Sequence, residues 1–256
     1  MRLGWFSTGR DGVARELLEV VWRKIREGFI PAEISYVFCN RERGEGEESD
    51  RFLKLCEELG LATFTLSSRS FQPDLRRRDR EGWRIAYHQE VARLLSPLRV
   101  DWIMLAGYML IVSPAMCQAF PMLNLHPALP DGPKGSWQEV IWQLIEEGAA
   151  RTGVMIHRVT EELDRGPVLT YCSFPIKGEG FAPLWREVEG VPIERLRQQR
   201  GEALLLFQAI RQEGVKRELP FILLTLRALA QGRLGEGSIS ALDLTEEVER
   251  ALQEGI

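Results

Sequence analysis

The stretch that decides the fold is Val100-Asp101-Trp102-Ile103-Met104-Leu105-Ala106-Gly107, near the middle of the chain. It is a largely apolar run that ends at a glycine, without the strict alternation of a strand that has one face in water. Such a run is typical of a parallel strand that is covered on both faces. The sequence therefore predicts a sheet flanked by helices.

Strand and helix patterns alternate on both sides of this run. Alternating or short apolar runs predict strands at residues 2–7, 33–39, 62–66, 122–125, 154–159 and 167–174. Helical periodicity predicts helices at residues 13–27, 49–59, 83–95 and 138–147, with Gly60 as a C-cap and Pro97 as a stop. Residues 67–82 are polar and rich in arginine, and they predict a loop. The order indicates an α/β, Rossmann-like fold with a mostly parallel twisted sheet, in which ligands bind beyond the carboxyl ends of the strands.

The character of the sequence changes after residue 180. Apolar periodicity predicts helices at residues 193–212 and 217–231, followed by a joint at 235–237. A last short helix is expected at residues 243–252, with Asp243 or Thr245 as its N-cap. We therefore expect an α/β domain at residues 1–180 and a helical C-terminal extension, packed on the core, at residues 181–256.

The bulk composition narrows the class of protein. The chain has 256 residues, 45% of them hydrophobic, and a formal net charge of −4, so no global basic surface for nucleic acid is expected. No apolar run is long enough to span a bilayer, and the N-terminus lacks the layout of a signal peptide. The four cysteines have no metal-binding spacing, which favours buried, reduced thiols. We expect a cytoplasmic protein that binds small molecules, without a metal, a membrane or nucleic acid; a homodimer is left open.

Three short motifs carry polar chemistry at ends of predicted strands. Asn124 and His126 are two residues apart at a strand end, so both side chains point to the same side, and Pro127 and Pro130 stiffen the loop that follows. Asp164 precedes a Gly-Pro turn. The turn Gly9-Arg10-Asp11-Gly12 leads into a helix, where backbone N–H groups can hold an anion, although it is not a GxGxxG fingerprint or a P-loop.

These side chains suit acyl transfer to an amine without a covalent intermediate. The amide of Asn124 or a protonated His126 could stabilise a tetrahedral oxyanion, and Asp164 could assist proton transfer. There is no Gly-x-Ser-x-Gly motif and no cysteine in a suitable context for an acyl-enzyme.

The order of these motifs resembles the folate-dependent formyltransferases, which use 10-formyltetrahydrofolate. The resemblance is carried by residues 101–109, Ser113-Pro114, Asn124-Leu125-His126-Pro127 and the stretch Thr160 to Pro167. It covers about residues 2–176 and resumes at 218–234. Within the family, it is greatest to the branch that formylates glycinamide ribonucleotide in purine biosynthesis.

The resemblance implies roles for individual residues. Asn124, His126 and Asp164 match the catalytic trio, and no metal is implied. The residues that match the folate-binding region are Met104, Leu105, Ala106, Gly107, Met109, Leu110, Val112, His157, Val159, Thr160, Glu161 and Leu163. The residues that match the binding region for the phosphorylated amine acceptor are Gly9, Arg10, Asp11, Gly12, Pro127 and Glu218.

Departures from the family pattern fall mostly on the acceptor side. The first turn lacks the usual Ser-Asn pair, and Arg10 is the residue that could replace its phosphate contacts. Leu110 stands where an arginine is common, and residues 183–216 have no counterpart. The alternatives are therefore a formyltransferase for another amine, such as an amino sugar or another ribotide, and a non-catalytic folate- or nucleotide-binding module. A formyltetrahydrofolate hydrolase, a methionyl-tRNA formyltransferase and a Rossmann oxidoreductase are disfavoured.

Four further predictions concern residues outside the motifs. His88 is expected on a helix surface, and Trp137 and Trp142 are expected to be partly buried in the core. The run Arg76 to Arg78 is expected in a solvated loop, with phosphate or polyglutamate binding as the alternative. Lys134 is the lysine expected nearest to an anionic ligand.

Overall fold

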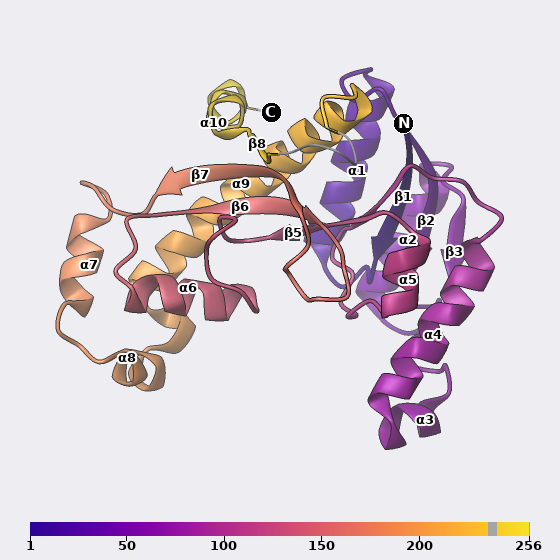
Figure 1. Cartoon of the computed structure of the whole chain (residues 1–256), viewed down its shortest axis with the longest axis horizontal. Coiled ribbons are helices and arrows are strands. Elements are labelled where there is room, and N and C mark those ends of the chain that lie inside the picture. Colours follow the sequence, from indigo (N-terminus) through magenta and orange to yellow (C-terminus); the bar gives the residue numbers. More distant parts are fainter. Residues whose placement is uncertain (235–239, 256) are drawn as a thin grey trace. The chain divides into compact units, whose positions relative to one another are not determined.

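A computed structural model describes residues 1–234 and 240–255 of the chain (Figure 1). Its contacts divide the chain into two compact units, each built from several segments. The first unit comprises Met1–Asn124, Arg158–Pro167 and Arg227–Arg233, and the second comprises Leu125–His157, Val168–Leu226 and Leu234–Ile256. The division at residue 180 stays a prediction. No helix among the described residues is long and apolar enough to cross a membrane.

The first unit is built on parallel strands, as predicted. These are β1 (Arg2–Ser7), β2 (Glu33–Cys39), β3 (Thr63–Thr65), β4 (Trp102–Leu105) and β5 (Met122–His126), whose last two residues belong to the second unit. Their order is β3-β2-β1-β4-β5, and all four pairings are parallel. This arrangement confirms the mostly parallel α/β fold.

One face of these strands carries an aromatic core. Phe6, Tyr36 and Phe38 pack there with side chains of α4 (Arg80–Leu95) and α5 (Pro114–Ala119). The neighbouring residues Trp5 and Val37 are also fully buried, and strand alternation turns them to the other face. Burial on both faces explains why the strand at 102–105 has an unbroken apolar sequence.

The helices of the first unit begin and end close to the predicted positions. α1 (Gly12–Arg26) starts at an Asp11 cap, and α2 (Glu47–Glu58) ends before Gly60, whose φ of 68° is the left-handed conformation that glycine tolerates. The short helix α5 was not predicted.

The prediction of a loop at residues 67–82 is wrong. Pro73 starts a short helix, α3 (Pro73–Arg78), and α4 begins at Arg80 because Asp79 accepts a hydrogen bond from Gly82 N. Arg76 lies over the Trp83 ring, 4.6 Å from its centroid, and donates to Ser68 O, so this arginine is not simply solvated. Packing against Trp83 is the tertiary contact that the polar sequence did not indicate.

The prediction of a surface His88 is also wrong. The side chain is 1% exposed, and its Nε2 lies 3.2 Å from the Tyr108 hydroxyl while its Nδ1 lies 3.0 Å from Arg84 O. Because a carbonyl oxygen only accepts, Nδ1 carries the proton and Nε2 accepts from Tyr108. Burial lowers the pKa of His88 to about 4.

The second unit contains an antiparallel pair of strands. β6 (Arg151–Arg158, its last residue in the first unit) pairs antiparallel with β7 (Val168–Pro175), and β7 pairs parallel with the short β8 (Leu242–Asp243). The helices of this unit are α6 (Trp137–Glu146), α7 (Ala182–Val188), α8 (Ile193–Gln199), a 3₁₀ turn (Gly201–Ala203), α9 (Leu205–Ala230, partly in the first unit) and α10 (Thr245–Glu254). The expected partial burial of Trp137 and Trp142 is confirmed, since both pack in the core of this unit.

The predicted helices at 193–212 and 217–231 are wrong in their boundaries. The first helix stops at Gln199, where Gly201 adopts a φ of 52°, and α9 then runs unbroken through Pro220. α7 and β8 were not predicted. The N-cap of α10 is Leu244, although Asp243 accepts a hydrogen bond from Thr245 N. The predicted joint at 235–237 lies outside the described residues.

Candidate active site

The first turn follows β1 directly and is shaped by short local hydrogen bonds. Gly9 has a φ of 60°, and its N–H donates to Ser7 Oγ at 3.1 Å. Asp11 accepts from Ala14 N at 3.1 Å, so its carboxylate caps α1. Arg10 is exposed and lies 3.7 Å from Asp11 Oδ2. The turn therefore offers backbone N–H groups and one cation that is already close to a carboxylate.

The exit of β4 contacts this turn through two hydrogen bonds. Thr8 N donates to Gly107 O at 3.1 Å, and Met109 N donates to Thr8 Oγ1 at 2.9 Å. Gly107 has a φ of 71°, which favours glycine at the point where the chain leaves the strand. The structure thus brings the predicted acceptor turn next to the predicted folate wall. Thr8, which directly precedes the predicted turn, was not among the predicted binding residues, although it makes both of these hydrogen bonds.

Asn124 lies at the same edge of the first unit. In the strand register, Leu105 pairs with Phe6 on one side and with Asn124 on the other. Asn124 is therefore level with the carboxyl ends of β1 and β4. Asn124 and His126 are alternate residues of β5, so their side chains point to the same side of that strand.

The loop at residues 158–167 is anchored beside β5. Val159 N donates to Met122 O at 2.8 Å, and Gln118 of α5 donates to Glu161 at 2.6 Å. The loop is closed at its base, where Arg158 N donates to Pro167 O at 2.9 Å. Asp164 adopts a φ of 55°, a left-handed conformation that non-glycine residues seldom hold outside constrained sites.

Large apolar side chains are exposed on these loops. Met109 and Ile111 after β4 are both 52% exposed, and Leu163 in the 158–167 loop is 58% exposed. Met104, Ala106 and Val112 are buried, and Leu110 packs against the core. Exposed apolar side chains on neighbouring loops are typical of a binding surface for a partly apolar ligand.

The two histidines of the predicted site lie in the second unit. His126 is 2% exposed, and its Nε2 lies 3.0 Å from Pro133 O, so this nitrogen carries the proton that the carbonyl accepts. His157 is equally buried on β6. Lys134 donates to Pro130 O at 3.0 Å, and Glu218 on α9 pairs with Arg211 at 2.7 Å.

The predicted residues are thus divided between the units. The first unit contains the turn, the β4 exit, Asn124 and the loop with Asp164; the second contains His126, Pro127, His157 and Glu218. The proximity of Asp164 to His126 stays a prediction. Within residues 1–234 and 240–255, no three His, Cys, Asp or Glu side chains are grouped as a metal site would require.

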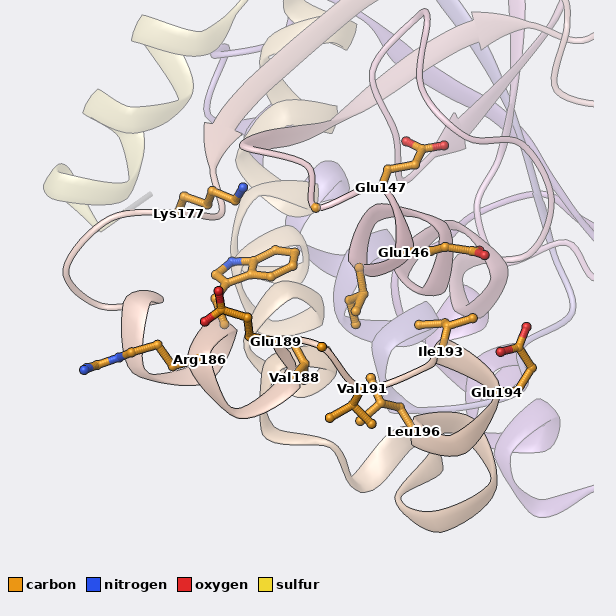
Figure 2. Close-up of a pocket in the computed structure, with 14 residues that line it drawn as sticks. Glu146, Glu147, Lys177, Arg186, Val188, Glu189, Val191, Ile193, Glu194 and Leu196 are labelled. Atoms are coloured by element: carbon orange, nitrogen blue, oxygen red, sulfur yellow. The ribbon is translucent and has the colours of Figure 1, made fainter.

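The second unit also has an open pocket of about 700 Å³ that includes none of the predicted site residues. It is lined by the end of α6 and by α7 and α8, and Figure 2 shows Lys177, Glu189 and Glu194 among its side chains. The sequence did not predict this pocket.

Comparisons with known proteins agree with the fold and with the predicted family. A sequence profile described as "Formyl transferase" matches residues 14–180. The chain is 32% identical to phosphoribosylglycinamide formyltransferase of Escherichia coli (strain K12) over 149 residues. These residues are 57% of this chain and 62% of that protein. It is 29% identical over 161 residues to the enzyme of the same name from Haemophilus influenzae, covering 62% of this chain and 68% of the other. The match thus spans less than two thirds of the Escherichia coli protein.

Solved structures of similar fold cover nearly the whole chain. Glycinamide ribonucleotide transformylase 1 from Symbiobacterium toebii aligns with a TM-score of 0.57 and 24% identity over 95% of this chain and 92% of that one. Phosphoribosylglycinamide formyltransferase from Anaplasma phagocytophilum aligns with a TM-score of 0.60 and 19% identity over 96% and 98%. The profile match covers more than half of the chain, and the chain therefore belongs to the formyl transferase family.

Proposed function

We propose that this chain transfers the formyl group of 10-formyltetrahydrofolate to the amine of glycinamide ribonucleotide, a step of purine biosynthesis. The observation that carries the proposal is the pair Asn124 and His126 on one side of β5, the strand whose first residue, Met122, accepts a hydrogen bond from the 158–167 loop, in a chain that matches the formyl transferase profile. The relatives named above supply the choice of acceptor.

The transfer of the formyl group consists of three events. The acceptor nitrogen attacks the formyl carbon, the bond from that carbon to the folate nitrogen breaks, and a proton moves from the attacking to the leaving nitrogen. Asn124 and His126 stabilise the negative oxygen of the tetrahedral intermediate. Asp164 assists the proton transfer.

The folate donor is held by the loops that follow β4 and β6. Met104 to Gly107, Met109, Leu110 and Val112 form one wall, and Val159 to Glu161, Leu163 and His157 form the other. The exposed apolar side chains of Met109 and Leu163 suit the flat ring system of a folate. The acceptor binds at Gly9 to Gly12, Pro127 and Glu218.

A second candidate is a formyltransferase for another amine, such as an amino sugar or a different ribotide. It is favoured by the first turn, where Asp11 is used as a helix cap and brings a negative charge close to the expected phosphate position. A non-catalytic folate- or nucleotide-binding module is the third reading. A cytoplasmic location and a homodimer remain predictions.

The acceptor can be tested by following release of tetrahydrofolate by absorbance. Purified protein is incubated with 10-formyltetrahydrofolate alone, with glycinamide ribonucleotide and with an amino sugar phosphate. We expect rapid release only with the ribotide. Release with a different amine would favour the second candidate, and folate binding without release would favour the third.

A further inference from the structure

A group of polar residues lies beyond the carboxyl ends of β2 and β3, next to the first turn. Asn40 follows β2 and Ser68 follows β3, and Ser68 N donates to Asn40 O at 3.1 Å. Both side chains are 1% exposed. Asn40 N in turn lies 3.4 Å from Ser7 O at the end of β1. This group therefore borders the turn that is proposed to receive the acceptor.

Three arginines from separate segments converge on this group. Arg41 donates to Ser68 Oγ at 3.4 Å, and Arg76 donates to Ser68 O at 2.8 Å. Arg69 donates to Glu45 O at 2.9 Å. The Arg76 guanidinium lies over the Trp83 ring, 4.6 Å from its centroid, and this contact and the hydrogen bond to Ser68 O position it.

Positive charge exceeds negative charge around Ser68. Glu45 pairs with Arg41 at 3.7 Å, and Glu42 accepts from Ser67 N at 3.3 Å. Among the described residues, no carboxylate forms an ion pair with Arg69 or Arg76, whereas the adjacent Arg77 pairs with Asp74. Burial, and then the charge of Arg69, lower the pKa of Arg41. Three guanidinium groups stand against two carboxylates, Glu42 and Glu45, and a bound anion would stabilise this excess of positive charge.

One buried polar atom of the group has no hydrogen-bond partner within the described part of the chain. Asn40 donates through Nδ2 to Ser68 Oγ at 3.0 Å, but its Oδ1 is buried without a hydrogen bond. If the amide is turned by 180°, its oxygen accepts from the Ser68 hydroxyl and its NH₂ group becomes the atom without a partner. That orientation places an unused donor among the arginines, as an anion site requires.

We propose that Arg41, Arg69 and Arg76, with Asn40 and Ser68, form a binding site for a phosphate monoester, and that its occupant is the phosphoryl group of the acceptor. The assignment to the acceptor rests on the proposed function, while the anion site itself does not. The first turn supplies one cation, Arg10, which already lies beside Asp11. The positive charge of Arg10 is therefore partly neutralised by Asp11. A phosphate dianion bound at this edge would be neutralised mainly by the three arginines.

The site can be tested by titrating inorganic phosphate into the full chain at constant ionic strength. Arg69→Ala removes an exposed guanidinium that, among the described residues, donates to one backbone carbonyl, Glu45 O, so folding should be preserved. Arg77→Ala is the matched control, with the same loss of charge outside the group. We expect at least tenfold weaker phosphate binding for Arg69→Ala and less than a twofold change for Arg77→Ala. No phosphate binding by the wild type, or equal loss in both variants, would overturn the site.

Kinetics distinguish the source of the phosphate. If the acceptor fills the site, Arg69→Ala raises the KM for glycinamide ribonucleotide at least tenfold, leaves the KM for the folate donor unchanged, and inorganic phosphate competes with the ribotide. An unchanged ribotide KM in a variant that has lost phosphate binding would overturn the assignment to the acceptor. Phosphate binding without any formyl transfer would instead contradict the proposed function and leave the anion site standing.

Discussion

At the scale of single residues, His88 connects the helix α4 to the start of the predicted folate wall. Its Nε2 accepts from the hydroxyl of Tyr108, which directly follows Gly107 and precedes Met109. The ring is neutral in the folded protein because burial lowers its pKa to about 4. Position on a helix could not predict this burial, since the partner Tyr108 is twenty residues away in the sequence.

The buried His88 should make stability depend on pH. The unfolded chain takes up a proton below about pH 6.5, whereas folded His88 does so only near pH 4, so the unfolded state binds more protons between these values. The contribution of His88 to the free energy of unfolding should therefore fall by about 3 kcal/mol as the pH drops from 6.5 to 4.

Urea unfolding at several pH values measures this effect. His88→Gln should flatten the slope between pH 6.5 and 4, while Tyr108→Phe, which keeps the imidazole, should retain it. An equal slope in His88→Gln and the wild type would contradict the assignment.

Some site residues could be predicted from the sequence and others could not. Asn124 and His126 were accessible because alternate residues of one strand share a side, whatever the rest of the fold does. Arg41, Arg69 and Arg76 were not, because they come from three segments that meet only through the pairing of β2 with β3 and the packing of α3 on α4. Sequence spacing carries no information on such contacts.

At the scale of elements, the 158–167 loop depends on a glycine at its base. A Cβ at Gly166 would lie 1.7 Å from Arg158 O, and the affected atom is backbone that cannot turn away. Gly166→Ala should therefore open the loop, lower stability by about 1–3 kcal/mol and raise the KM for the folate donor at least tenfold.

Gly180→Ala is the control for this loop, because nothing lies within 4 Å of its added Cβ. It should leave both the melting temperature and the KM for the folate donor close to the wild-type values. A Gly166→Ala variant with a normal KM for the folate donor would show that the loop does not contact that substrate.

The long helix α9 contains a glycine, Gly214, whose replacement by alanine should stabilise the protein. A Cβ at Gly214 would meet Phe174 Cζ at 3.9 Å, which is ordinary van der Waals contact. Because alanine favours helices over glycine by about 0.5–1 kcal/mol, Gly214→Ala should raise the melting temperature by about 1–2 °C.

Gly60→Ala should change the melting temperature in the opposite direction. Gly60 has a φ of 68°, a left-handed conformation that costs alanine about 1–2 kcal/mol, so this variant should melt lower than the wild type. A lower melting temperature for Gly214→Ala would mean that α9 needs glycine at that position.

The element boundaries that sequence reasoning missed have a common cause. The gap between the helices predicted at 193–212 and 217–231 contains Gly214, a residue that disfavours helix, yet the single helix α9 runs through it. The reverse error occurred at residues 73–78, where charged residues form a helix that packs on α4. The strands β1 and β2 were predicted well because their apolar patterns reflect burial directly.

At the scale of the whole molecule, the four cysteines report on folding. All four are free and buried, and burial raises the pKa of Cys39 to about 11 and those of Cys56 and Cys172 to about 12. Because the thiolate is the reactive form, Ellman's reagent at pH 8 should label none of them quickly in the native protein. Denaturant should release four reactive thiols. Rapid labelling of any thiol in the native state would contradict this burial.

The proposed function requires this chain to move a formyl group to glycinamide ribonucleotide through Asn124 and His126. The most direct test follows the carbon-13 label of the formyl group from 10-formyltetrahydrofolate into the ribotide by mass spectrometry. We expect labelled formylglycinamide ribonucleotide with the wild type. His126→Ala should form the product at least a hundredfold more slowly, measured well below its melting temperature, which should fall because a buried side chain and its hydrogen bond to Pro133 O are lost. Two results would contradict the proposed function. The ribotide could remain unlabelled although the protein binds the folate donor, or His126→Ala could turn over at a near-normal rate.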